Sequence, residues 1–412
     1  MQLWDFPIAT VSSAAFYALL LCFAFPGTRG VVTRIFAHPI PPHQSYLYGF
    51  DTLRGFAAAL VAIGHCWWAT YPVFAKTQGQ FPFLAYGAKG VPIFAVLSGF
   101  LIYRSALGSI QSIEKLRAYA IRRFFRIYPV YALAVILCFL TGQYVDGPYT
   151  SVTSAFFADL FALNVFDWPG FANPPAWSLY VEIAFYAFLP IMVLVVPRKW
   201  VVQFCLVGIV VMILADYESR VFALWRYFLV GIVAAELSPR IKPFPSLLLF
   251  CSGLILFVID FRGINYDWVA KLGIGRLHQD GMSIGLGLAC GLMFASLPNL
   301  TLIGRALNVA PLRMIGVISY SVYLTHFFYI KANFPEIGLF TKLGTQPMYD
   351  QFSRLPMYSQ WYLPLVFFPG VFFWGAVSFL LIERPGMLLG KYLLNNRAQR
   401  TAGSVFSTSE RA

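Results

Sequence analysis

The chain has 412 residues, of which 59% are hydrophobic, 18% aromatic and only 11% charged. Soluble domains carry about 25% charged residues, so this composition excludes an ordinary water-soluble enzyme and predicts an all-α membrane protein. The net charge of +13 would suit a nucleic-acid partner, unless the basic residues follow a membrane topology. Six cysteines lie inside apolar runs and form no CxxC or Cys/His cluster, so we expect neither disulfides nor a metal site.

Eleven apolar stretches approach the roughly 20 residues that a membrane-spanning helix requires. In chain order they cover about 8–25, 52–71, 86–104, 125–142, 177–196, 200–215, 220–237, 246–260, 281–297, 314–331 and 362–382. A further stretch, 151–166, is interrupted by Asp159 and is predicted to be a loop near the membrane interface. No Lys or Arg precedes the first stretch, which therefore lacks the basic start of a signal peptide.

A proline-containing segment, 37–48, separates the first predicted helix from the rest of the chain. We therefore interpret 1–47 as an extra transmembrane helix with a cytoplasmic linker, and 48–386 as one module of ten helices. Residues 387–412 are predicted to form a cytoplasmic tail that is largely disordered, because the end of the chain is rich in Ser, Thr and Arg.

The basic residues gather on one side of the membrane if residue 1 lies outside and the spans alternate. The loops that are then inside carry most of the Lys and Arg, whereas the outside segment 143–176 has acidic residues and no basic one. This bias fits the positive-inside rule, so nucleic acid is not needed to explain the net charge. We expect a multi-pass protein of a bacterial inner or cell membrane, with its N-terminus outside and its C-terminus in the cytoplasm.

Three ionisable side chains lie inside predicted spans, where such groups are costly and are functional candidates by default. They are His65 in the second span, Glu182 in the fifth and His326 in the tenth. At 1.5 Å per helical residue, each lies about 7–9 Å from the outer end of its span, so we expect all three at a similar depth. A carboxylate beside an imidazole would support a general base. The alternative is three unrelated polar residues, and His326 could simply bond a backbone carbonyl.

Basic residues near the cytoplasmic edge suit an anionic donor. Arg54 precedes His65 by close to three helical turns, so both project from one helix face, about 16 Å apart along the axis. Arg122, Arg123 and Arg126 suit phosphate groups. They equally suit anionic lipid headgroups, and Arg54 alone could be an ordinary cytoplasmic anchor.

Together these stretches resemble the acyltransferase-3 family of polytopic membrane O-acyltransferases. The resemblance covers about 48–386 and rests on motifs that occur in the family's order. They are FDTLRGFAAALVAIGH (Arg54, His65), GVPIFAVLSGFLIYRS (Gly90, Phe94, Ser98, Gly99), RRFFRIYP (Arg122, Arg123, Arg126, Ile127, Pro129), PAWSLYVEIAFY (Trp177, Ser178, Glu182), ISYSVYLTH and IERP (Glu383, Arg384, Pro385). Each motif is weak alone, and their occurrence in order is specific.

The resemblance implies transfer of an acyl group, usually acetyl, from cytoplasmic acyl-CoA to a hydroxyl of a carbohydrate or glycoconjugate. Acyl-CoA would be a co-substrate, and no tightly bound cofactor is expected. The resemblance implies His65 as the catalytic histidine and places Arg122, Arg123 and Arg126 on the motif linked to the acyl donor. From their positions we add Glu182 to the catalytic residues, Arg54 and Ser98 to the acyl-CoA site, and Trp177, Ser178, Tyr323 and His326 as supporting or acceptor-side residues. We expect the module to act without the carboxy-terminal SGNH domain that some members carry, and we assign no chemistry to the extra helix 8–25.

Two other functions fit parts of the sequence. A transporter or exporter of an anionic or acylated compound would also have many helices with intramembrane His and Glu, and inverted repeats would favour it. Another class of membrane O-acyltransferase would place an Asn beside a catalytic His, and no intramembrane Asn lies near His326. The acceptor, the acyl chain, the protein partners and the oligomeric state are not encoded in any motif that we recognise.

Overall fold

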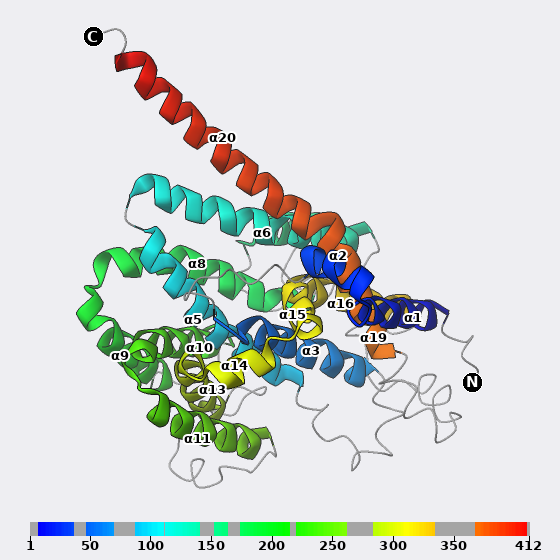
Figure 1. Ribbon diagram of the computed structural model, residues 1–412, viewed down its shortest axis with the longest axis horizontal. Coiled ribbons are helices and arrows are strands. Elements are labelled where there is room, and N and C mark those ends of the chain that lie inside the picture. The colour runs from blue at the N-terminus through cyan, green and yellow to red at the C-terminus, as the bar shows by residue number, and fades with distance from the viewer. Residues whose placement is uncertain are drawn as a thin grey trace.

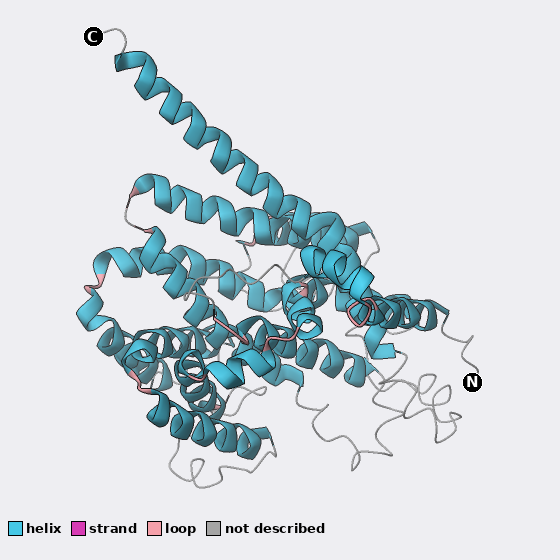
Figure 2. Cartoon of the chain, viewed as in Figure 1, coloured by secondary structure: helices cyan, strands magenta, loops and turns pink. Residues whose placement is uncertain are grey.

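The computed structural model of the chain describes residues 7–36, 47–69, 87–110, 112–140, 152–163, 174–214, 220–261, 283–333 and 367–409. Over these ranges helices are the only regular elements (Figures 1 and 2). Their bounds are α1 Pro7–Leu21, α2 Pro26–Phe36, α3 Phe50–Ala69, α5 Gly90–Ser109, α6 Ile113–Leu140, α7 Val152–Leu160, α8 Trp177–Val195, α9 Val201–Leu214, α10 Arg220–Leu237, α11 Pro243–Phe261, α13 Ile284–Ser296, α14 Thr301–Leu307, α15 Ala310–Val317, α16 Ser319–Asn333, α19 Phe368–Ser378, a π-helical segment Phe379–Glu383, and α20 Arg384–Ser409.

The described helices confirm an all-α integral membrane protein but not the predicted count of eleven spans. Five segments are long and apolar enough to cross a membrane alone: Gly87–Gly108, Ile113–Leu140, Trp177–Val195, Pro243–Asp260 and Phe368–Asn396. Two more pairs of described helices meet this criterion only together, with a bend of 109° between α1 and α2 and of 104° between α13 and α14. Helices such as α9, with 14 residues, and α16, with 15, are shorter than the roughly 20 residues of a straight span.

Helix α5 lies inside the bundle, between α3 and α10, and two glycines make its contact with α10. A Cβ atom on Gly99 would overlap the carbonyl oxygen of Phe228, and one on Gly231 would overlap that of Val96. Small residues let membrane helices approach until their backbones touch. Because each helix contributes a glycine, the contact fixes the position of α5 along α10.

Glycines also hold helix α3 against two neighbours. Gly64 faces Gly87 just before α5, and Gly55 faces Gly316 of α15. These two glycines directly neighbour His65 and Arg54, respectively. The close approach of the backbones therefore limits how either side chain moves relative to α5 and α15.

The predicted extra helix packs against the last helices of the module. Phe16 of α1 stacks on Phe372 of α19, with ring centroids 5.5 Å apart, and the indole nitrogen of Trp374 donates to Ser12 Oγ at 3.0 Å. After the bend, Phe36 at the end of α2 contacts the ring of Phe379, where the π-helical segment begins. The first two helices are thus joined to the module through buried aromatic contacts.

Two segments that we expected to lack regular structure are helical. The expected interfacial loop contains α7, in which Asp159 is buried and accepts a hydrogen bond from the Tyr180 hydroxyl at 2.9 Å. The expected disordered tail is continuous with α20, which extends from the body of the molecule to Ser409 (Figure 1). The leucine-rich sequence that begins this helix has no proline after Pro385, so nothing ends the helix near residue 386.

The glycine contact between α5 and α10 predicts that Gly99→Val destabilises the protein by about 1–3 kcal/mol or more, because the added side chain has no space. Gly108→Val is the matched control on the same helix, since a Cβ there meets no atom within 4 Å. Thermal unfolding of both variants in detergent measures the effect. Equal melting temperatures for the two variants would show that this contact is dispensable.

Candidate active site

Two histidines from distant parts of the chain meet between α3 and α16. Nδ1 of His65 lies 2.9 Å from Nε2 of His326, and the two rings are nearly parallel, with 10° between their planes. His326 is fully buried, whereas His65 is partly exposed. His65 therefore has a buried partner on one side and remains accessible from outside the protein on another. We call this pair the histidine end of the site.

The hydrogen bonds of the pair determine where its protons lie. Nδ1 of His326 lies 3.2 Å from the carbonyl oxygen of Val322, which can only accept, so this nitrogen carries a proton. In the neutral ring, Nε2 of His326 is then an acceptor, and Nδ1 of His65 must donate to it. This assignment follows from the hydrogen-bond network. It leaves Nε2 of His65 with its lone pair available as a base.

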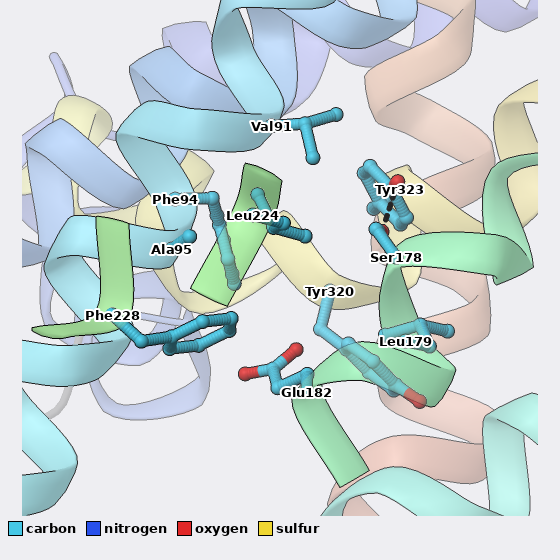
Figure 3. Close-up of a pocket in the computed structure, with 10 residues that line it drawn as sticks. All are labelled: Val91, Phe94, Ala95, Ser178, Leu179, Glu182, Leu224, Phe228, Tyr320 and Tyr323. Carbon is cyan, nitrogen blue, oxygen red and sulfur yellow. Dashed lines mark hydrogen bonds between the residues drawn. The ribbon is translucent and has the colours of Figure 1, made fainter. Parts of the chain in front are cut away.

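A narrow, mostly apolar cavity lies beside the histidine end (Figure 3). Its accessible volume is about 20 Å³, which is room for about one water molecule. Its walls come from α5, α8, α10 and α16 and consist of Val91, Phe94, Ala95, Ser178, Leu179, Glu182, Leu224, Phe228, Tyr320 and Tyr323. Neither histidine lines the cavity. His326 is next to it, because the ring centroid of His326 lies 6.0 Å from that of Tyr323, which does line it.

One wall of the cavity is held in place by hydroxyl groups. Tyr323 Oη and Ser178 Oγ lie 2.6 Å apart, and the tyrosine also donates to the carbonyl oxygen of Pro175 at 2.9 Å (Figure 3). Tyr320, one turn earlier on α16, donates to the Ile127 carbonyl oxygen at 2.8 Å. These bonds fix both tyrosine rings, so the cavity wall on α16 is preformed.

The carboxylate of Glu182 is buried at the opposite part of the cavity. Its Oε1 accepts from Ser98 Oγ at 3.1 Å and from Tyr186 Oη at 2.5 Å. Tyr186 follows Glu182 by four residues and therefore lies on the same helix face. Its ring is covered in turn by Arg123, whose guanidinium carbon lies 5.5 Å from the ring centroid.

Three cationic side chains gather near Glu182, and we call Arg54, Arg123 and Arg126 the arginine end of the site. The guanidinium group of Arg54 lies over the ring of Phe94, 5.7 Å from its centroid, and so borders the cavity. Arg54 and Arg126 interact electrostatically with each other. Arg122, expected beside them, is exposed on α6, whereas Arg123 and Arg126 are half-buried.

The contacts place Glu182 away from the histidines, contrary to the depth that its sequence position predicted. Gly87 faces Gly64 and so marks the level of His65, whereas Ser98, the partner of Glu182, lies eleven residues further along the helical segment Gly87–Gly108. That separation corresponds to about 16 Å. The two histidines do share a level, as predicted, and Glu182 belongs to the arginine end.

Several residues of the site were not predicted from the sequence. Tyr186 and Tyr320 were not singled out, although each lies three or four residues from a candidate on the same helix face. Glu383 was quoted in a motif without a role, because the last predicted span stopped one residue before it. Trp177, an expected supporting residue, begins α8 and packs partly buried against the core rather than lining the cavity.

Comparison with known proteins defines the class of this protein. Residues 47–384 match the acyltransferase-3 family model, which is described as an acyltransferase domain. Together with the apolar helices, this match identifies a membrane-embedded acyltransferase. Because it covers most of the chain, the protein belongs to the acyltransferase-3 family, and the expectation from the sequence motifs is confirmed.

Three relatives show how far the likeness extends. The chain is 28% identical over 329 residues to the acyltransferase MdmB of Streptomyces mycarofaciens, covering 71% of this chain and 81% of the relative. It is 26% identical over 309 residues to BcsY of Komagataeibacter xylinus, whose name describes a membrane-bound transacylase, covering 67% and 71%.

The third relative is nodulation protein 10 of Rhizobium leguminosarum bv. viciae, with 30% identity over 184 residues and 39% of this chain covered. The match spans about half of that relative, 48% of its length. No solved structure matches the chain.

Proposed function

We propose that the protein transfers an acyl group, most simply acetyl, from cytoplasmic acyl-CoA to a hydroxyl of a carbohydrate or glycoconjugate. One observation carries this proposal: a narrow cavity lies between a cluster of half-buried cations and a histidine whose neutral tautomer leaves a base available. The arginine end would hold the phosphate groups of the donor. The cavity, which has room for about one water molecule, would have to widen to take the pantetheine arm and bring its thioester toward His65.

The distance between the two ends supports an extended donor. Arg54 and His65 are separated by about 16 Å along α3, and the lining between them is apolar apart from Glu182 and a few hydroxyl groups. Such a lining suits a thin, weakly polar chain and disfavours bulk water. In the proposed topology the arginine end faces the cytoplasm, as the positive-inside rule favours, and acyl-CoA is a co-substrate rather than a bound cofactor.

The proposed chemical step uses the lone pair of His65 Nε2. This nitrogen removes the proton of the acceptor hydroxyl as its oxygen attacks the thioester carbonyl carbon. The tetrahedral intermediate then collapses, the carbon–sulfur bond breaks, and the thiolate takes the proton from the imidazolium to give free CoA. His326 accepts from Nδ1 of His65 throughout and holds the reacting tautomer.

The contacts of Glu182 suggest a different role from that of a partner for His65. Its carboxylate links Ser98 to Tyr186 in the cavity wall, and Arg123 covers the Tyr186 ring. We propose that Glu182 and Ser98 shape the donor path, while Ser178 and Tyr323 form the wall nearest the histidine end.

Replacing His65 tests the proposed base. His65→Ala should lower transfer by ~10²–10⁴, the usual contribution of a general base, while donor binding persists. The measurement is acetyl transfer from radiolabelled acetyl-CoA to membrane or surface glycans, together with mass spectrometry for a mass increase of one acetyl group. Cys66→Ala, which removes a buried side chain from the same turn, controls for packing. Wild-type transfer by folded His65→Ala would refute the assignment, and passage of unchanged substrate across proteoliposomes without label transfer would indicate a carrier.

The histidine pair predicts that His326→Leu lowers kcat by about tenfold or more, because Nδ1 of His65 would lose its acceptor and the reacting tautomer would no longer be favoured. The KM for acetyl-CoA should change little, since the donor phosphates lie at the other end. His326→Gln, which can still accept, should recover part of the rate. Equal rates for the leucine and glutamine variants would show that the hydrogen bond does not matter.

The arginine end predicts that Arg126→Gln raises the KM for acetyl-CoA about 10–100-fold. A charge-assisted hydrogen bond contributes about 1.5–3 kcal/mol, and each 1.4 kcal/mol is a factor of ten. Arg240→Gln is the control, because that side chain is exposed and interacts with Glu236 instead. Binding of CoA to purified protein, measured by calorimetry, gives an independent value. Parallel effects of the two substitutions would argue against a donor site at Arg126.

A further inference from the structure

A second buried carboxylate, that of Glu383, lies beside the arginine end without lining the cavity. Only 1% of this residue is exposed, although a carboxylate inside a membrane bundle is costly to bury. It ends the π-helical segment Phe379–Glu383 between α19 and α20. Such segments carry an extra residue per turn and occur frequently at functional sites.

Two contacts set the position of Glu383. Its Oε2 accepts a hydrogen bond from Ser321 Oγ at 2.6 Å, which ties it to the helix that carries Tyr323 and His326. One turn after Glu383, Gly386 packs against the carbonyl oxygen of Phe125. Because Phe125 precedes Arg126, this close approach brings the start of α20 to the basic part of α6.

The charges around Glu383 are those of the proposed donor site. The carboxylate interacts electrostatically with Arg126 and, more weakly, with Arg54. These two cations also repel each other. Arg54 also faces Asp51 at 3.9 Å, whereas Glu383 interacts with both cations. Without an anion shared between them, like charges in a medium of low dielectric constant would separate toward water.

We propose that Glu383 is a positioning residue that keeps the guanidinium groups of Arg54 and Arg126 together beside the cavity, ready for the phosphate groups of the donor. This inference rests on the proposed function. Glu383 does not touch the reacting atoms. Its bond to Ser321 fixes the carboxylate on α16, so the same helix aligns the cations at one end and His326 at the other.

The test compares Glu383→Gln with Glu236→Gln in the full-length protein in detergent. Both glutamates are buried and both bind a hydroxyl group and interact with arginines, but Glu236 pairs with Tyr103 and Arg198 elsewhere in the fold. Glu383→Gln keeps the shape and an acceptor for Ser321 and removes the charge. We expect it to weaken CoA binding about tenfold and to raise the KM for acetyl-CoA, with a smaller change in kcat at saturating donor, whereas Glu236→Gln leaves both unchanged.

A double-substitution cycle separates positioning from a general loss of structure. Once Arg126→Gln has removed the cation, adding Glu383→Gln should weaken CoA binding by less than twofold, because interacting residues are not additive. Ser321→Ala retains the carboxylate without its anchor and should weaken binding less than Glu383→Gln does. If Glu383→Gln does not fold, Glu383→Asp and Ser321→Ala serve as the test, and wild-type affinity in both overturns the inference.

The outcomes distinguish this inference from the function on which it rests. If wild-type protein binds no CoA and transfers no acyl group, the proposed function fails and the inference fails with it. If the wild type binds CoA and folded Glu383→Gln binds it equally or more tightly, the inference alone is refuted. Selective weakening that disappears in the Arg126→Gln background supports it.

Discussion

Every ionisable group that lies among apolar helices needs a partner, and this need constrains the fold. An unpaired polar group in such surroundings costs several kcal/mol. The buried carboxylates that the structure describes meet this requirement with cations or hydroxyl groups, most of them from other parts of the chain. The pairs are Glu182 with Ser98 and Tyr186, Glu383 with Ser321, Glu236 with Tyr103 and Arg198, Asp260 with Lys89 and Ser283, and Asp159 with Tyr180. Since nearly all of these bonds join different helices, they select one register for the bundle.

These polar pairs contribute more to specificity than to net stability. Moving charges out of water offsets much of what a buried pair gains, so the apolar contacts and the glycine-mediated approaches stabilise the packing. The reciprocal contact of Gly99 and Gly231 sets the depth of α5 relative to α10. At that depth Ser98 reaches Glu182, and the cavity lies between the two ends of the site. Packing therefore sets the position of α5 along α10, and the polar bonds disfavour positions in which α5 is shifted along its axis.

The sequence predicted the helices and the residue types of the site better than their relative depths. The pairing of His65 with His326 agrees with depths counted from the ends of their spans. The same count failed for Glu182, because it assumed that every span starts at one plane. Helix α8 starts inside the bundle instead, where the carbonyl oxygen of Pro175 is bonded by Tyr323. Hydropathy also does not predict how a helix is rotated about its axis. For this reason Arg122, Arg123 and Arg126 received the same predicted role from the sequence, although Arg122 is exposed.

The extra amino-terminal helices are connected to the site through one aromatic contact. Phe36 at the end of α2 packs on Phe379, both almost fully buried, and Phe379 begins the π-helical segment that ends at Glu383. A π-helical segment is strained relative to regular helix and persists where tertiary contacts support it. The bend of 109° between α1 and α2 directs the second helix toward this segment, while Phe16 and Ser12 anchor the first helix on α19. The part of the chain that precedes the acyltransferase domain thus supports the same segment that carries the carboxylate beside Arg54 and Arg126.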